Sequence, residues 1–301
     1  MAIVVGGEAL IDLVADGDGL AAHPGGGPYN TARTLGRLEQ DVHYLGCVSD
    51  DAFGRRLRAL LAEDGVQLDT VVGTALPTTL ALAELDADGA ASYRFYSEGT
   101  SAPALTPEAA LARLPDVECL HVGTLGLVME PSGEALLAAV EAVADRALVM
   151  VDPNCRPAFI PDRDDYRARI EPTLRRAHVV KASADDLAFL APGVGVVEAA
   201  RGLGVPVALV TLGGDGALIV DADTEVHVPA PKVTVVDTIG AGDAFSGGFL
   251  AHWARAGRGR DALADQEAVR AATAFACVVA ARTCERAGAS PPRLSDLDGD
   301  L

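Results

Sequence analysis

Short apolar runs alternate with segments of helical periodicity along most of this chain. A short continuous apolar run is typical of a buried strand, whereas apolar residues recurring every three or four positions are typical of a helix that covers a sheet. Strands are predicted at residues 3–5, 42–48, 70–72, 119–122, 147–151, 178–181 and 207–212, and helices are predicted to begin near residues 30, 53, 132 and 166. This alternation predicts an α/β protein whose mainly parallel sheet carries helices on both faces.

Two segments depart from the alternation. Residues 12–23 are polar and rich in glycine, and residues 79–97 alternate apolar and polar side chains as two strands around a turn at 86–89. The second segment predicts a β-hairpin that has no helix to pair with. After residue 212 the pattern becomes a meander, with strands expected at 217–220, 225–228 and 233–236, followed by helices at 243–256 and 266–282.

The most informative motif is Asp-Thr-Ile-Gly-Ala-Gly-Asp-Ala-Phe at residues 237–245. Its turn of Gly240, Ala241 and Gly242 opens a helix, so unpaired backbone N–H groups and the positive end of the helix dipole converge on one point. Such a point suits an anion, and a phosphate in particular. Asp243 lies on the same turn, where its carboxylate could take a proton from a hydroxyl that attacks the phosphate. These residues are the minimum apparatus of a phosphotransferase whose acceptor is an alcohol.

The alternative is a structural turn in which the glycines provide tight geometry and Asp243 caps the helix. Two other nucleotide-binding motifs are excluded. Phe245 occupies the third glycine position of Gly-x-Gly-x-x-Gly, and the chain has no Gly-Lys-Ser/Thr of a P-loop. An NAD-dependent dehydrogenase is excluded because its glycine fingerprint is missing.

A second, distant motif favours the catalytic interpretation. It is Gly-Gly-Gly-Pro-Tyr-Asn-Thr-Ala at residues 25–32. Its glycines let a ligand approach the backbone closely, and Asn30 offers a donor and acceptors for sugar hydroxyls. With both motifs, the chain resembles the ribokinase-like (PfkB) carbohydrate kinases, and among them the bacterial fructokinases most. Asp12 and the segments 152–156, 211–217 and 288–291 also match in family order, so the resemblance spans nearly the whole chain.

The resemblance implies a ribokinase-like three-layer sandwich formed by residues 1–301 as one domain, with a discontinuous β-sheet lid from about 13–23 and 77–100. It implies Asp243 as the general base beside an anion hole formed by Gly240, Ala241 and Gly242. The residues expected to bind the substrate are Asp12, Gly26, Gly27, Asn30, Tyr96, Arg156 and Asp243. The residues expected around the nucleotide are Ser183, Thr211, Gly213, Asp215, Gly216, Gly240 and Gly242.

Structural alternatives remain for several of these residues. Asp12 could be a polar turn residue, Arg156 a structural salt-bridge partner and residues 213–216 a plain hairpin turn. Ser183 and Asp186 stand where the family usually shows Asn-x-x-Glu. Because the carboxylate of Asp186 is shorter than that of a glutamate, it is expected to reach magnesium only through water.

The expected activity is transfer of the γ-phosphate of magnesium ATP to a hydroxymethyl group of a sugar, with fructose as the expected substrate. Tyr93, Phe95 and Tyr96 lie on the second lid strand, and strand alternation lets only part of this set contact the sugar. Ketodeoxygluconate kinases, as resembled relatives, carry an arginine beside these aromatic residues, whereas this chain has Ser97. A ketodeoxygluconate kinase, a ribokinase- or nucleoside-kinase-like enzyme and a non-catalytic sugar- or nucleotide-binding regulator remain alternatives. The resemblance further implies a homodimer joined through residues 79–97 and allows a monovalent cation such as K⁺.

Composition narrows the choice of partners. A net charge of −19 argues against nucleic acid or an anionic membrane. It does not argue against ATP, because backbone amides and bound magnesium neutralise phosphates locally. Five scattered cysteines and six dispersed histidines indicate reduced thiols rather than disulfides or a metal site. With no long apolar run and no basic amino-terminal leader, the chain is expected to be soluble and cytoplasmic.

Overall fold

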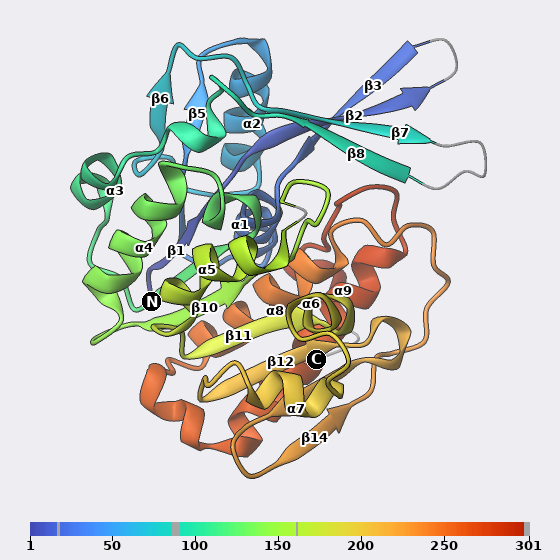
Figure 1. Cartoon of the computed structure of the whole chain (residues 1–301). Helices are drawn as coiled ribbons and strands as arrows, with labels where there is room; N and C mark the ends of the chain where they lie inside the picture. The colour runs from blue at the N-terminus through green and yellow to red at the C-terminus, as the bar shows by residue number, and fades with distance from the viewer. Residues whose placement is uncertain (17–18, 86–90, 161, 298–301) are drawn as a thin grey trace.

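The main apolar runs pair into one eight-stranded sheet in the order β14-β13-β12-β11-β10-β9-β1-β4 (Figure 1). Neighbouring strands are parallel from β4 to β12, and the last two pairs, β12–β13 and β13–β14, are antiparallel. The structure is a computed structural model that describes residues 1–16, 19–85, 91–160 and 162–297. The strands of this sheet are β1 (Ile3–Gly6), β4 (Val42–Leu45), β9 (Cys119–Gly123), β10 (Leu148–Asp152), β11 (Val179–Ser183), β12 (Val207–Thr211), β13 (Ala217–Val220) and β14 (Glu225–Val228).

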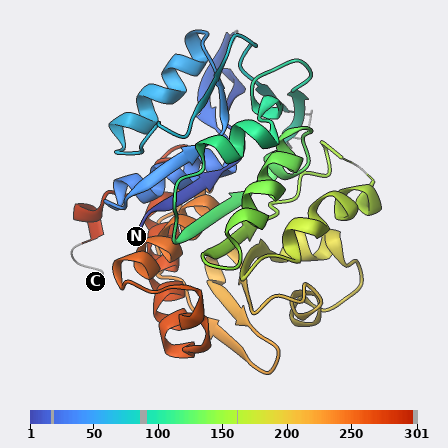
Figure 2. The ribbon, with the colours of Figure 1, turned by 90° about the vertical axis from the view of Figure 1, so that its left-hand side faces the viewer.

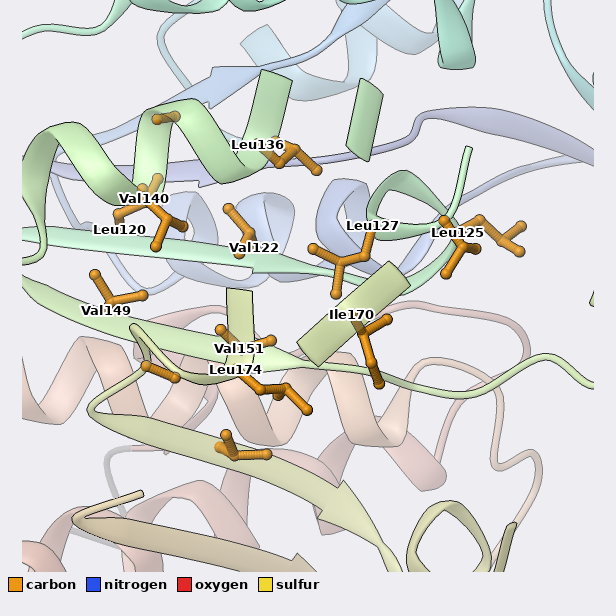
Figure 3. Close-up of a cluster of buried hydrophobic side chains, with 14 of the residues drawn as sticks. Leu120, Val122, Leu125, Leu127, Leu136, Val140, Val149, Val151, Ile170 and Leu174 are labelled. Carbon is orange, nitrogen blue, oxygen red and sulfur yellow. The ribbon is translucent and has the colours of Figure 1, made fainter. Parts of the chain in front are cut away.

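Helices cover both faces of the sheet, because successive strand side chains point into two different cores. Val4, Leu120 and Val149 face one core, which Figure 3 shows and which helices α3 to α7 complete. Ile3 and Met150 face the other core, which α1, α2, α8 and α9 complete. The helices are α1 (Gly27–Arg37), α2 (Ala52–Glu63), α3 (Pro107–Arg113), α4 (Ser132–Val143), α5 (Arg163–Leu174), α6 (Ala184–Leu190), α7 (Val196–Arg201), α8 (Ala241–Arg255) and α9 (Gln266–Cys284).

The result is a three-layer α/β sandwich, as expected. Figures 1 and 2 show the orange and red helices α8 and α9 on one side of the sheet and the green helix α4 on the other. No helix in the described part of the chain is long and apolar enough to cross a lipid bilayer.

A separate sheet of four strands, ordered β3-β2-β7-β8, projects from this sandwich (Figure 1). Its strands are β2 (Leu10–Asp16), β3 (Gly19–Gly25), β7 (Leu80–Leu85) and β8 (Ala91–Tyr96). This sheet, called the lid sheet below, contains both segments that depart from the main alternation. The turn expected at 86–89 lies outside the described residues. A further pair of short strands, β5 (Cys47–Ser49) and β6 (Val72–Thr74), lies next to α2.

Two strand predictions are wrong. Residues 42–48 form two strands instead of one, because β4 and β5 on either side of Gly46 join different sheets. Residues 233–236 form no strand. Val236 donates its N–H to the carbonyl of Cys284 at 2.8 Å instead of to a neighbouring strand. Val233 and Val235 line a surface cavity, so their apolar character reflects that cavity and not a strand.

Candidate active site

Strands β1, β9, β10 and β11 end at the same edge of the main sheet, and a cavity of about 370 Å³ opens there below the lid sheet. Tyr93 and Phe95 of β8 line this cavity, which is called the polar cavity below. Its charged and amide side chains come from six different segments. They are Glu8, Asp12, Asn30, Asn154, Arg156, Lys181 and Asp243, and Gly26, Gly27, Gly240 and Gly242 also line the wall.

Helix α8 begins inside the polar cavity, at the Gly-Ala-Gly turn. Gly240 has a φ of 77°, a left-handed conformation that glycine adopts without strain, and no side chain caps the helix. Among the described residues, the N–H groups of Gly240, Gly242 and Asp243 have no acceptor. The N–H of Ala241 donates to the carbonyl of Thr238 at 3.2 Å, so Ala241 contributes less than expected. The free N–H groups give this turn, called the anion turn below, the character of an anion site.

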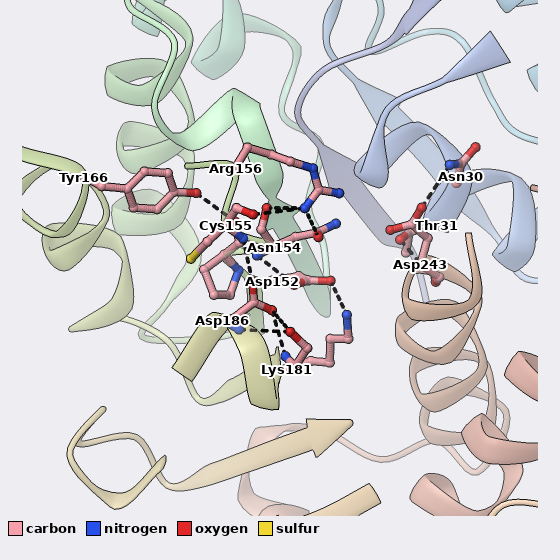
Figure 4. Close-up of polar contacts among 12 residues, drawn as sticks. Asn30, Thr31, Asp152, Asn154, Cys155, Arg156, Tyr166, Lys181, Asp186 and Asp243 are labelled. Atoms are coloured by element: carbon pink, nitrogen blue, oxygen red, sulfur yellow. Dashed lines mark hydrogen bonds and ion pairs between the residues drawn. The ribbon is translucent and has the colours of Figure 1, made fainter. Parts of the chain in front are cut away.

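Asp243 lies on the first turn of α8 and is buried. Its Oδ2 accepts a hydrogen bond from Nδ2 of Asn30 at 2.9 Å (Figure 4). Burial raises the pKa of Asp243 to about 7, although the Asn30 hydrogen bond and the charge of Lys181 act in the opposite direction. A carboxyl group that ionises near neutral pH is well matched to taking a proton from a hydroxyl group.

Asn30 has one polar atom still unpaired. Its Oδ1 is buried and, within the described part of the chain, accepts no hydrogen bond. A buried acceptor without a donor costs about 1–3 kcal/mol. A hydroxyl group bound in the polar cavity would supply the missing donor, which supports Asn30 as a substrate contact.

Asp12 enters the cavity from the lid sheet. The strand register places Asp12, Ala81 and Phe95 in one row across β2, β7 and β8, so they share a face of the sheet. A Cβ atom at Gly25 would lie 2.0 Å from Oδ2 of Asp12, so only glycine leaves room for this carboxylate. Burial raises the pKa of Asp12 to about 6, and the charge of Arg156 lowers it in part.

Arg156 lies in the loop that follows β10. Its Nη1 donates to both oxygens of Asn154 and to the carbonyl of Cys155 (Figure 4). Asn154 has a φ of 35°, a left-handed conformation that turns the loop toward the cavity. Within the described part of the chain, the partners of Arg156 are therefore neutral oxygens of its own loop and no carboxylate, which weakens its interpretation as a structural salt bridge.

Glu8 is a site residue that the sequence analysis missed. Its Oε1 accepts from the N–H of Gly27 at 3.1 Å and its Oε2 from the N–H of Gly126 at 2.8 Å. One buried carboxyl group thus fixes both the Gly-rich turn and the turn after β9. Its position directly after the first strand was a usable signal, because side chains at the carboxyl ends of parallel strands meet at one edge.

A second cavity of about 210 Å³, called the apolar cavity below, lies on the other side of the α8 turn. Thr211, Gly213 and Gly216, three of the residues expected around a nucleotide, line it. Ala280 of α9 forms part of its apolar wall. The two cavities have Thr238 and Gly242 in common, so they meet at the anion turn.

Ser183, Asp186 and Asp215 do not line either cavity. Ser183 and Asp186 form a capping box at the start of α6, where Asp186 accepts from the N–H and Oγ of Ser183. The second oxygen of Asp186 accepts from the N–H of Cys155 at 2.7 Å. With both oxygens engaged, Asp186 is a poor direct metal ligand, and the described residues contain no group of three or more metal-binding side chains.

Tyr96 was expected to contact the substrate, but it lies outside the polar cavity, unlike the other expected substrate residues. It is 49% exposed and does not line the polar cavity. The register pairs Tyr96 with Leu80, whereas Phe95 pairs with Ala81 in the row of Asp12. Strand alternation therefore turns Tyr93 and Phe95 toward the cavity and Tyr96 away from it.

Comparison with known proteins places these motifs in a family. The model of the pfkB family carbohydrate kinases matches residues 2–296. The chain belongs to this family. This confirms the predicted resemblance to the PfkB carbohydrate kinases and the expected kinase class. The solved structures below confirm the fold class. The comparison covers the whole sandwich and the lid sheet.

Individual relatives are similar over most of the chain. A fructokinase of Rhizobium leguminosarum bv. trifolii is 37% identical over 81% of this chain and 77% of that protein. The structure of a fructokinase with bound ATP from Xylella fastidiosa superimposes with a TM-score of 0.90 at 28% identity, covering 99% of this chain and 98% of that one. A fructokinase of Vibrio cholerae O395 with bound fructose, ADP and calcium ion gives a TM-score of 0.84 at 27% identity, covering 96% and 94%.

The protonation of Glu8 leads to a prediction about stability. Burial raises the pKa of Glu8 from 4.5 to about 8, so the folded protein binds a proton that the unfolded chain releases. This contribution is complete below about pH 4.5 and is lost as the pH rises through about 8. The free energy of unfolding should therefore fall between pH 5 and 8, with a share from Glu8 of up to about 1.4 kcal/mol per pH unit.

Urea unfolding of the wild type and of Glu8→Gln across this pH range measures that share. The variant should show a flatter dependence on pH, whatever its absolute stability. Glu63→Gln, at an exposed position of α2, is the matched control and should keep the wild-type slope. Equal slopes for Glu8→Gln and the wild type would contradict the assignment.

Proposed function

We propose that this protein is an ATP-dependent fructokinase, which transfers the γ-phosphate of magnesium ATP to a hydroxymethyl group of fructose. One observation carries the proposal: the buried carboxyl group of Asp243 lies on an anion-binding turn where a polar and an apolar cavity meet. A sugar fits the polar cavity, and an adenine ring fits the apolar one. The names of the relatives, and the fructose and ADP in one of them, support the same substrates.

The chemistry follows from this arrangement. The attacking hydroxyl donates to Asp243, and the charge that develops on the phosphoryl oxygens is stabilised by the free N–H groups of Gly240 and Gly242. Phosphoryl transfer is loose, so the proton leaves the hydroxyl late and a weak base is sufficient. The lid sheet excludes water from this event, because Tyr93 and Phe95 cover the polar cavity.

Magnesium belongs to the proposal as part of the nucleotide complex. When bound, it neutralises phosphate charge. The described residues hold no cluster of side chains that would ligate it directly, and Asp186 is engaged by Ser183 and Cys155. Activation by a monovalent cation such as K⁺ is a further part of the proposal.

A neutral sugar is favoured over a sugar acid. A carboxylate substrate needs a fixed cationic partner, ideally a bidentate arginine. Arg94 pairs in register with Leu82, on the face of the lid sheet opposite Phe95, and Ser97 stands where the resembled ketodeoxygluconate kinases carry an arginine. Arg156 is held by its own loop. A non-catalytic regulator is disfavoured, because a binding module would not need Asp243 beside an anion site.

We further propose a homodimer joined through the lid sheet. Strands β3 and β8 form its two edges, and an isolated ribbon with open edges tends to pair. Leu20 of β3 and Tyr96 of β8 are 59% and 49% exposed. A cytoplasmic location belongs to the same proposal, because ATP is a cytoplasmic substrate and all five cysteines are free thiols.

The role of Asp243 is tested by Asp243→Asn. The amide cannot take the proton, so kcat should fall by about 10²–10⁴, whereas ATP binding should change little. Steady-state kinetics with fructose and calorimetric titration with ATP measure the two quantities. Near-normal turnover in a folded variant would contradict the assignment.

The choice of sugar is tested by comparing kcat/KM for fructose and for ketodeoxygluconate under identical magnesium ATP. Fructose should be preferred strongly, because Ser97 stands on the lid strand where acid-specific relatives carry an arginine, and Arg94 lies on the opposite face of the lid sheet. A preference for the acid would overturn the fructokinase proposal and leave the kinase family intact. Activity on a pentose or nucleoside alone would contradict the fructose proposal and the interpretation of the residues around Ser97 on the lid strand.

The dimer is tested by sedimentation at micromolar concentration. The wild type should sediment as a dimer, and Tyr96→Asp should shift it toward monomer by placing a charge on the lid face. Leu111→Asp is the matched control, since Leu111 of α3 is exposed to a similar extent, 46%, away from the lid sheet. A monomeric wild type would count against the proposal.

A further inference from the structure

Lys181 is a charged side chain of the polar cavity that the chemistry above does not use. It lies on β11, and 4% of its side chain is exposed. Its Nζ donates to Oδ2 of Asp152 at the end of β10, at 2.9 Å (Figure 4). A buried ion pair usually loses more solvation than its attraction returns, so stability alone is a weak reason for this pair.

The position of the ammonium group points to the reaction. A Cβ atom built on Gly242 would lie 2.7 Å from Nζ of Lys181, so the ammonium group lies against the backbone of the anion turn. Gly242 is one of the two residues that both cavities share. A group that passes from the apolar to the polar cavity therefore passes beside Nζ.

The composition of the chain makes a lysine at this place informative. All but two of the 24 basic residues are arginines, and the second lysine is the exposed Lys232. Arginine is the residue of choice for buried ion pairs, because its planar fork matches a carboxylate. A compact point charge with three donors is what lysine offers instead. That property suits a charge which must fit between a carboxylate and a tetrahedral or planar phosphoryl group.

We propose that Lys181 is a catalytic residue whose ammonium group binds the phosphoryl group during its transfer, an inference that rests on the proposed function. Asp152 holds one N–H of Nζ and leaves two for phosphoryl oxygens. The bond from the sugar oxygen to phosphorus forms as the bond from phosphorus to the β,γ-bridging oxygen breaks. The hydroxyl proton goes to Asp243, and Lys181 stays protonated throughout.

The surroundings of Lys181 keep it charged. Burial by itself lowers the pKa of Lys181, but the carboxylates of Asp152 and Asp186 outweigh it and hold the pKa above its ordinary value. Asp243 acts in the same direction. His121 of β9, buried nearby, has its pKa lowered to about 3 by burial and by Lys181, so it adds no competing charge.

Kinetics of single and double variants separate catalysis from charge neutralisation. Lys181→Met leaves Asp152 buried and unpaired, and this variant alone could lose its fold. The double variant Asp152→Asn with Lys181→Met removes both charges and keeps an oxygen for the N–H of Asn154. It should fold, bind ADP and fructose normally, and lose about 10²–10³-fold in kcat relative to Asp152→Asn alone. Lys232→Met is the matched control and should keep the wild-type kcat.

Two outcomes decide the matter. If the double variant turns over like Asp152→Asn, the ammonium group only neutralises Asp152 and the inference is wrong. If the wild type phosphorylates no sugar in the same assay, the proposed function fails first, independently of Lys181.

A spectroscopic measurement tests contact directly. Protein labelled with ¹³C at the lysine ε carbon gives two resonances, and Lys232→Arg identifies the one from Lys181. Adding ADP, fructose and tetrafluoroaluminate, which mimics the phosphoryl group in flight, should shift the Lys181 resonance, whereas ADP and fructose alone should shift it much less. Equal shifts with and without tetrafluoroaluminate would overturn the proposal.

Discussion

The hydrogen bond from Asn30 to Asp243 is the contact on which the site depends. It joins residues 213 positions apart and brings the first turn of α8 against α1. Gly247 permits this approach, because a Cβ atom there would lie 2.6 Å from the side chain of Thr34. The oxygen of Asp243 that Asn30 does not hold, Oδ1, lies close to Gly27. One bond therefore aligns the Gly-rich turn, the base and the anion turn, and places them between a polar and an apolar cavity.

Burial gives the carboxyl groups of this site different proton affinities. The pKa is raised to about 8 for Glu8, about 7 for Asp243 and about 6 for Asp12. In each case burial is the largest cause, and hydrogen bonds or nearby cations oppose it. Glu8 is thus mostly neutral at physiological pH and serves as a brace for two turns, whereas Asp243 ionises in the range where it can accept a proton. Separate roles arise from similar side chains because their surroundings differ.

The sequence was sufficient for the layers of the fold and for predicting that Asp12, Asn30, Arg156 and Asp243 lie around one cavity. The apolar runs of β1, β9, β10 and β11 are buried on both faces, so their pattern was unambiguous, and the glycine motifs marked both turns. The apolar stretch around Val235 misled, because side chains that line a ligand cavity look like those of a strand. Tyr96 was misplaced, since alternation predicts two faces and not which one meets the ligand. Glu8 and Lys181 were missed as site residues because their roles depend on neighbours from distant strands.

The order of the elements along the chain has a consequence for synthesis on the ribosome. The polar cavity draws Glu8, Asp12 and Asn30 from the first part of the chain, but Asp243 and the Gly-Ala-Gly turn come from the start of α8, near the end. A nascent chain that has not yet emerged as far as residue 243 contains Glu8, Asp12 and Asn30 but lacks Asp243 and the helix that carries it. The polar cavity is therefore complete only once α8 has packed against α1.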